Sequence, residues 1–171
     1  MTAETLSATI TVQVSADAVF AVLADPGSHA AIDGTGWVCE PLDSERLTTS
    51  GQVFRMVMHH PQHPDGQYET ANQIRELDAP HVIAWATGTQ DGEGRLTFGG
   101  WTWRYDLAPT AAGGTRVRLT YDWSGATRHA REVVQFPPFD PEHLDDSLRH
   151  LAALASSGRP PSRDARRHDQ H

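Results

Sequence analysis

The sequence predicts an α+β fold: an antiparallel sheet, two short helices directly after its first strand, and one long helix at the C-terminal end. Three observations lead to this prediction. The chain of 171 residues opens with a strand pattern that changes at once to a helical pattern. Between residues 37 and 123, apolar residues recur at every second position in successive segments, and no helix of any length fits there. A helical pattern returns only after residue 140, so the sheet should be an antiparallel meander.

The first strand is predicted over residues 8–14. Every second residue there is apolar and the residues between are polar, which is the period of a strand with one buried face. The apolar residues are Ala8, Ile10, Val12 and Val14.

Two short helices follow this strand. From residue 16 the apolar residues fall at i, i+3, i+4 and i+7, one stripe of a helix that Ser15 can cap with its hydroxyl. Asp25-Pro26 ends this helix, because proline disfavours helical geometry in the residue before it, and Asp25 can then cap the second helix. Gly34 or Gly36 would end the second helix. The stripe of the first helix consists of Ala16, Val19, Phe20 and Leu23.

Six further strands are predicted, over residues 37–42, 53–59, 68–77, 82–89, 101–107 and 116–123. Pro41 marks the first of these as an edge or bulged strand, because proline cannot donate to a neighbouring strand. Asp78-Ala79-Pro80 is a turn, and Gly113-Gly114 makes a tight hairpin, since glycine allows positive φ values. The glycine-rich segment 88–100 is expected to be a mobile hairpin connection.

The long C-terminal helix is predicted to begin at Asp140-Pro141, with Asp140 as its cap and proline at its first position. Gly158 is a suitable stop. The chain then divides into a single domain over residues 1–158 and an arginine-rich tail over 159–171. The tail has no apolar cluster whose burial could offset the cost of ordering it, so it is predicted to be disordered. The apolar stripe of the helix consists of Leu144, Leu148, Leu151, Leu154 and Ala155.

Composition restricts the partners and the compartment. The formal net charge of −8 repels phosphate backbones, so nucleic acid is not expected as a partner. Cys39 is the only cysteine, which excludes an intramolecular disulfide and favours a reducing compartment. Neither a signal peptide nor a membrane span is visible in the sequence. We therefore expect a cytoplasmic protein.

The order of elements and three segments resemble the START/Bet v1-like superfamily, also called SRPBCC or helix-grip proteins. The segments are residues 10–26, 80–85 and 114–120, and the resemblance covers about residues 7–157. They look like the bacterial members named polyketide cyclase/dehydrase or lipid-transport proteins. This resemblance implies a curved antiparallel sheet wrapped around the C-terminal helix, with a cavity between them. It also implies hydrophobic ligands such as lipids, sterols, polyketides or quinones.

Large apolar side chains on the predicted strands are suited to line such a cavity. Several are spaced by two, so whole aromatic rows can face inward, although each could instead fill the core. Asn72 shares their face and could either hydrogen-bond a ligand or lie on a solvated strand face. The predicted ligand-binding residues are Phe54, Met56, Met58, Tyr68, Asn72, Trp85, Trp101, Trp103, Tyr121 and Trp123.

Other polar residues carry weaker signals. Arg104, Arg116 and Asp122 have the opposite strand parity, so we place them on the outer face, as possible partners in cross-strand ion pairs. His59, His60 and His63 have a spacing that could suit zinc, but the prolines between and after them disfavour a helix and no further ligands lie nearby. We therefore predict a loop with no metal site. Arg128 and His129 either gate the cavity or are plain loop residues.

Three functions fit these observations. The first is binding of a small hydrophobic ligand, such as a lipid, polyketide or quinone, in the cavity between the sheet and the C-terminal helix. The alternative is a polyketide aromatase/cyclase-type enzyme that acts on a ligand in that cavity, with cyclase/dehydratase-like activity and no metal. The second alternative is a module that binds a protein partner. No cofactor is predicted, and the sequence assigns no catalytic residue and no oligomeric state.

Overall fold

The computed structural model describes residues 4–33, 38–43, 45–59 and 67–157, and its seven strands form one antiparallel sheet. The strands are β1 Thr5–Val12, β2 Val38–Pro41, β3 Val53–His59, β4 Gln67–Asp78, β5 Val82–Gln90, β6 Leu96–Pro109 and β7 Thr115–Asp122. Their spatial order is β1-β7-β6-β5-β4-β3-β2. Strands β2 to β7 are neighbours in both sequence and space, which confirms the meander, and β1 completes the sheet by pairing with β7.

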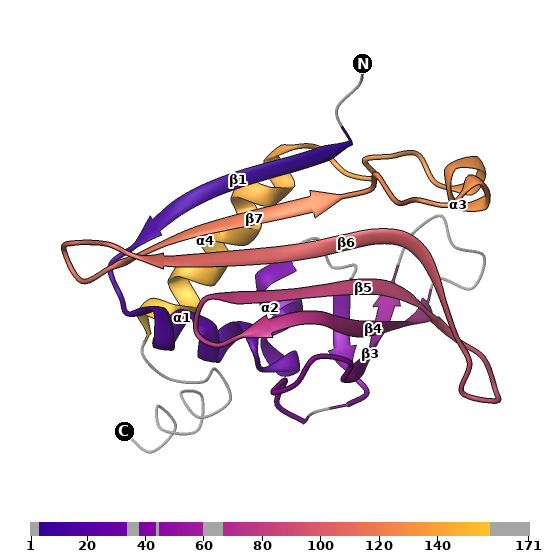
Figure 1. The fold of residues 1–171 in the computed structure, drawn as a ribbon, viewed down its shortest axis with the longest axis horizontal. Coiled ribbons are helices and arrows are strands. Elements are labelled where there is room, and N and C mark those ends of the chain that lie inside the picture. Colours follow the sequence, from indigo (N-terminus) through magenta and orange to yellow (C-terminus); the bar gives the residue numbers. More distant parts are fainter. Residues whose placement is uncertain (1–3, 34–37, 44, 60–66, 158–171) are drawn as a thin grey trace.

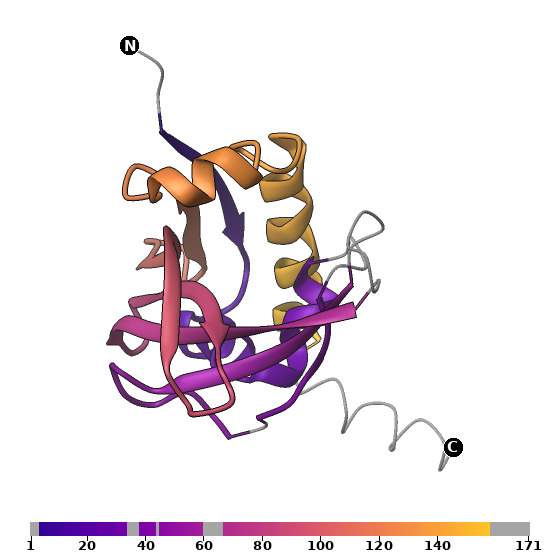
Figure 2. The ribbon, with the colours of Figure 1, turned by 90° about the vertical axis from the view of Figure 1, so that its right-hand side faces the viewer.

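The sheet is curved, and the longest helix lies along its concave side (Figures 1 and 2). Two short helices after β1 contact this long helix. The fold is therefore the predicted α+β arrangement of a sheet wrapped around a C-terminal helix. The helices are α1 Ala16–Leu23, the 3₁₀ turn η1 Pro26–Ser28, α2 His29–Asp33, α3 Arg128–Val133 and α4 Glu142–Ser156.

The caps predicted for the first two helices are confirmed. Ser15 Oγ accepts a hydrogen bond from the Ala18 N–H at 3.2 Å, and Asp25 Oδ1 accepts one from the Gly27 N–H at 2.9 Å. The second helix begins as the 3₁₀ turn η1 and continues as α2. The expected stops at Gly34 or Gly36 and at Gly158, and the tail, lie outside the described residues.

Strand β6 begins five residues before the predicted position, so the glycine-rich segment is mostly strand rather than a hairpin connection. The pairing of β5 with β6 is interrupted between Ala86 and Gly88, opposite Gly99 and Gly100. Gly100 has φ +102°, and a Cβ atom there would lie 2.0 Å from the Gly125 carbonyl oxygen. A side chain is excluded at this position. Gly100 therefore permits the close approach of Gly125, in the segment before α3, and is not part of a loop.

Two expectations about the C-terminal third are wrong. The sequence suggested no helix between the last strand and the long helix, yet α3 forms there, capped by Thr127. Only Ala130 of α3 is buried, so the helix has no apolar stripe that could have indicated it. The cap expected from Asp140 is also wrong, since helix α4 has no side-chain cap. Only the backbone carbonyl of Asp140 takes part, and it accepts a hydrogen bond from the His143 N–H at 2.9 Å.

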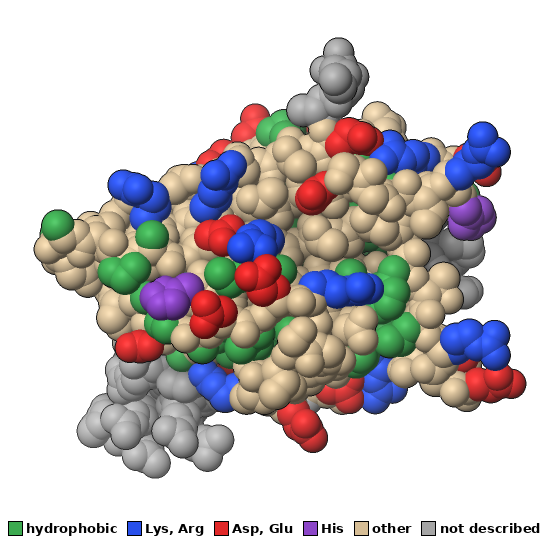
Figure 3. Space-filling model, viewed as in Figure 1, with side chains coloured by type: hydrophobic (Ala, Val, Ile, Leu, Met, Phe, Trp, Pro, Cys, Tyr) green, Lys and Arg blue, Asp and Glu red, His purple; other side chains and the backbone are tan. Residues whose placement is uncertain are grey.

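The core lies between the concave face of the sheet and the helices. Helix α4 contributes Leu144, Leu148, Leu151 and Ala155, all buried as predicted. The opposite face of the sheet carries interspersed acidic and basic side chains (Figure 3). Arg104 lies in an ion-pair cluster, with Glu76 Oε1 at 2.7 Å and Asp106 Oδ2 at 3.0 Å, in agreement with its expected outer-face position.

Candidate functional site

The ten side chains predicted to bind a ligand are all buried or half-buried. Phe54, Met56 and Trp85 belong to the hydrophobic core, and Met58 and Trp103 pack against it. Asn72, Tyr121 and Trp123 are buried as well, while Tyr68 and Trp101 are half-buried.

The aromatic rings in the interior form two groups. The first, here called the His29 cluster, consists of His29, Phe54, Trp85 and Tyr105, whose neighbouring ring centroids lie 5.3–6.1 Å apart. The second, here called the Trp103 cluster, lies between β6, β7 and the segment that leads into α4. Its neighbouring centroids lie 4.5–6.5 Å apart. Its members are Trp101, Trp103, Tyr121, Trp123, Phe136, Phe139 and His143.

The two clusters differ in exposure. All four members of the His29 cluster are buried. In the Trp103 cluster, by contrast, Trp101, Trp103, Phe136 and Phe139 are half-buried and keep part of their ring surface accessible. The His29 cluster therefore serves as core, whereas the Trp103 cluster offers aromatic surface that a ligand could cover.

A polar pair adjoins the Trp103 cluster. Nε2 of His143, in the first turn of α4, lies 3.5 Å from Oδ1 of Asp33, at the end of α2. Their side chains are 11% and 13% exposed. Asp33 also acts electrostatically on Tyr68 from β4 and on Tyr105 from β6. The pair thus lies where α2, α4 and the concave face of the sheet meet.

Burial keeps the groups around this pair neutral. It lowers the pKa of His143 below its usual value; the negative charge of Asp33 opposes this shift and the nearby His150 adds to it. The pKa values of Tyr68 and Tyr105 are raised, first by burial and then by the charge of Asp33. Burial also raises the pKa of Tyr121. At neutral pH the imidazole is uncharged and the three phenols keep their protons.

Several polar atoms in this region have no hydrogen-bond partner. Within the described residues, Nδ1 of His143 and the hydroxyls of Tyr105 and Tyr121 make no hydrogen bond. Ser28 Oγ is the one fully buried side-chain nitrogen or oxygen, in the same part of the chain, that lacks a partner. Tyr105 and Tyr121 are buried, at 4% and 2% exposure, whereas the side chain of His143 is 11% exposed.

Asn72 points inward, but its amide is used by the sheet. Its Nδ2 donates to the Phe54 carbonyl at 3.3 Å, and its Oδ1 accepts from Thr87 Oγ1 at 2.8 Å. These contacts join β3, β4 and β5. The amide thereby ties together three strands, and its ligand contact remains a prediction.

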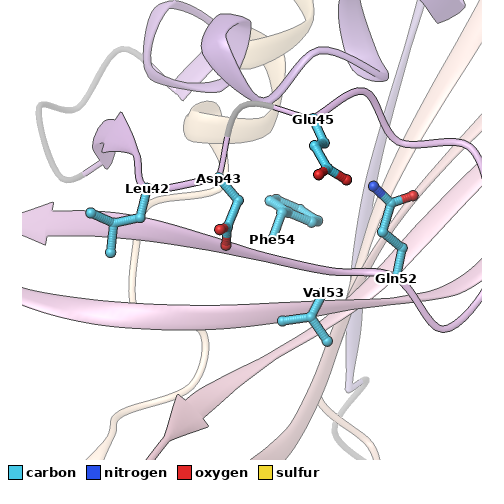
Figure 4. Close-up of a pocket in the computed structure, with 6 residues that line it drawn as sticks. All are labelled: Leu42, Asp43, Glu45, Gln52, Val53 and Phe54. Carbon is cyan, nitrogen blue, oxygen red and sulfur yellow. The ribbon is translucent and has the colours of Figure 1, made fainter. Parts of the chain in front are cut away.

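A cavity of about 320 Å³ lies elsewhere, beneath the connection between β2 and β3 (Figure 4). Of the ten predicted site residues only Phe54 is among its lining residues. Asp43, on its wall, holds the guanidinium of Arg55 through two hydrogen bonds of 2.9 and 3.0 Å. This polar wall suits water better than a hydrophobic ligand. The lining consists of Leu42, Asp43, Glu45, Gln52, Val53 and Phe54.

The remaining candidates do not form a site. His59 is exposed at the end of β3, and His60 and His63 lie outside the described residues. In the part of the chain that the structure describes, no three His, Cys, Asp or Glu side chains are grouped so that they could hold a metal ion. Arg128 and His129 are exposed in α3. No helix among the described residues is long and apolar enough to cross a membrane.

Sequence reasoning missed Asp33, His143, Phe136 and Phe139. None belongs to a motif, and Asp33 and His143 lie on helices far apart in the chain, so no spacing could have joined them. Tyr105 was within reach, because it shares its strand face with Trp101 and Trp103.

The curved sheet around α4, with aromatic side chains on its concave face, defines a helix-grip protein. The sequence matches the family described as "Polyketide cyclase / dehydrase and lipid transport" over residues 3–156. The chain belongs to this family. No curated protein matches it.

Solved structures of similar fold come from several bacteria. Protein Ms6760 from Mycobacterium smegmatis is 20% identical with a TM-score of 0.64, over 91% of this chain and 93% of that one. Protein CV1439 from Chromobacterium violaceum is 19% identical with a TM-score of 0.62, over 90% and 98% of the two chains. The Aha1 dimer from Colwellia psychrerythraea is 12% identical with a TM-score of 0.56, over 91% and 98%. At these identities the likeness supports the fold alone.

Proposed function

We propose that the protein binds a small hydrophobic ligand between the concave face of the sheet and α4, in contact with the Trp103 cluster. The observation that carries this proposal is the partial exposure of Trp101, Trp103, Phe136 and Phe139 on an otherwise buried aromatic surface. Flat aromatic surface of this kind gains most when an apolar molecule covers it. Membership of a family whose description includes lipid transport supports the same function.

The test is ligand capture and stabilisation. Protein purified from its own host is analysed by native mass spectrometry for a co-purifying apolar molecule. In parallel, unfolding is followed with long-chain fatty acids, quinones and aromatic polyketides. A ligand that binds only the folded state raises the melting temperature. An empty protein that none of these compounds stabilises would overturn the proposal.

Variants localise the ligand. Trp103→Leu removes aromatic surface from the Trp103 cluster while keeping an apolar side chain, and should weaken binding. The matched control is Val133→Ala, at an apolar residue of α3 that is 67% exposed and outside the cluster. Equal affinity of the two variants for a ligand that binds the wild type would place the ligand elsewhere.

A second candidate function is chemical conversion of the bound molecule, of the cyclase or dehydratase type. It is favoured by the Asp33–His143 pair, because such reactions need a group that accepts and returns a proton. Incubation with an aromatic polyketide precursor, followed by mass spectrometry of the products, separates conversion from storage. The second alternative, binding of a protein partner, is not favoured, since in the described part of the chain only Leu42 and Val133 are large exposed apolar residues.

A further inference from the structure

We infer that His143, held by Asp33, accepts a hydrogen bond from a hydroxyl group of the ligand. The ligand class is then an aromatic molecule with a phenolic or enolic O–H, rather than a plain hydrocarbon chain. This inference rests on the proposed function, because it requires the ligand to lie on the Trp103 cluster. It adds the chemical group that is recognised and the residue that recognises it.

The position of His143 is the first support. Its ring centroid lies 4.8 Å from that of Phe139 and 6.3 Å from that of Trp103, so the imidazole is part of the aromatic surface. It comes from α4, whereas the aromatic partner Trp103 comes from β6. A flat molecule that covers the rings of Phe139 and Trp103 would bring its edge to the imidazole.

The orientation of the imidazole is the second support. Nε2 faces Oδ1 of Asp33 at 3.5 Å, and a carboxylate oxygen can only accept. The proton of the neutral ring is therefore favoured on Nε2, which leaves Nδ1 with a lone pair. Nδ1 makes no hydrogen bond within the described residues and is not among the sealed atoms. It is an acceptor open to a ligand.

The groups that face His143 keep it an acceptor. Asp33 from α2 favours the charged ring, but burial and His150, two turns further along α4, favour the neutral ring. Tyr68 and Tyr105, which the same carboxylate influences from the sheet, keep their protons. Tyr121, whose ring lies 5.0 Å from that of Phe139, is buried. The accessible edge of the cluster thus offers one acceptor, complementary to a molecule with a hydroxyl group.

A purely structural role is the competing explanation: the pair could simply tie α2 to α4. His150 already does so, since its Nδ1 donates to the Ile32 carbonyl at 3.0 Å. A structural role predicts that changes at His143 alter stability alone. Recognition predicts that they alter the preference between ligands that differ by one hydroxyl.

The experiment measures that preference with two probes, 2-naphthol and 2-methylnaphthalene, by quenching of tryptophan fluorescence. The wild type should bind 2-naphthol about tenfold more tightly, the usual size of one well-placed hydrogen bond. His143→Phe should reduce the ratio to about one while leaving 2-methylnaphthalene affinity within about twofold. His143→Gln, which keeps an acceptor oxygen, should restore part of the ratio. His129→Phe, at an exposed histidine of α3, should leave it unchanged.

The outcomes are distinguishable. If wild type and His143→Phe show the same ratio, the inference is overturned, although binding of both probes still supports the proposed function. If the wild type binds neither these probes nor the lipids and quinones above, both fail. Should His143→Phe not fold, Asp33→Asn takes its place, and an unchanged ratio in that variant overturns the role of the pair.

Discussion

Replacing Asn72 with alanine separates a structural amide from a ligand-binding one. The amide is 5% exposed and makes two hydrogen bonds, to the Phe54 carbonyl and from Thr87 Oγ1. At about 1 kcal/mol net for each hydrogen bond, Asn72→Ala should lower the free energy of unfolding by about 2 kcal/mol. For a chain of this size that corresponds to a decrease in melting temperature of about 4–8 °C.

Urea unfolding followed by tryptophan fluorescence measures this change. Thr87→Val removes one of the two hydrogen bonds and should cost about 1 kcal/mol. In the double variant the two losses should not add, because both remove the same contact. Unchanged stability of Asn72→Ala together with lost ligand binding would refute this reasoning and assign the amide to the ligand.

Three further predictions concern the backbone, the buried histidine and the outer face. Gly100→Ala should cost more than about 2 kcal/mol, because the new Cβ would meet the Gly125 carbonyl at a positive φ; Gly92→Ala, with nothing within 4 Å, is its control in urea unfolding. Burial lowers the pKa of His29, so the unfolded chain binds the proton more tightly. Stability should therefore be complete above pH 6.5 and decrease as the pH falls, less steeply in His29→Gln. Arg104→Gln should cost less than about 1 kcal/mol in thermal unfolding, because its ion pairs are half-exposed.

Specific results would contradict each of these three. Equal stability of Gly100→Ala and Gly92→Ala would mean that the bend in β6 tolerates a side chain. Parallel pH profiles of wild type and His29→Gln between pH 8 and 5 would remove His29 as a cause of acid sensitivity. For Arg104→Gln, a decrease in the free energy of unfolding by several kcal/mol would contradict a weak surface role for the ion pairs of Arg104. A stability difference between this variant and the wild type that 1 M salt leaves unchanged would contradict it as well.

Much of the fold could be predicted because its signals are local. The caps at Ser15 and Asp25 depend on neighbouring backbone N–H groups, and the strands depend on residues that alternate across a pleat. The prediction was wrong where a signal was absent or came from elsewhere. Helix α3 buries only Ala130, and the bend of β6 at Gly100 lies against Gly125, which follows the neighbouring strand β7.

The sequence by itself determined the α+β class, the order of the elements and the inward aromatic rows, because a strand places alternate residues on one face whatever lies above it. Only the tertiary structure decided which of those rings are sealed. The His29 cluster, to which α2 contributes His29, is buried, whereas Trp101, Trp103, Phe136 and Phe139 are half-buried. It also decided that Asp33 meets His143, since the docking of α2 on α4 brings the two together and no pattern along the chain encodes that contact.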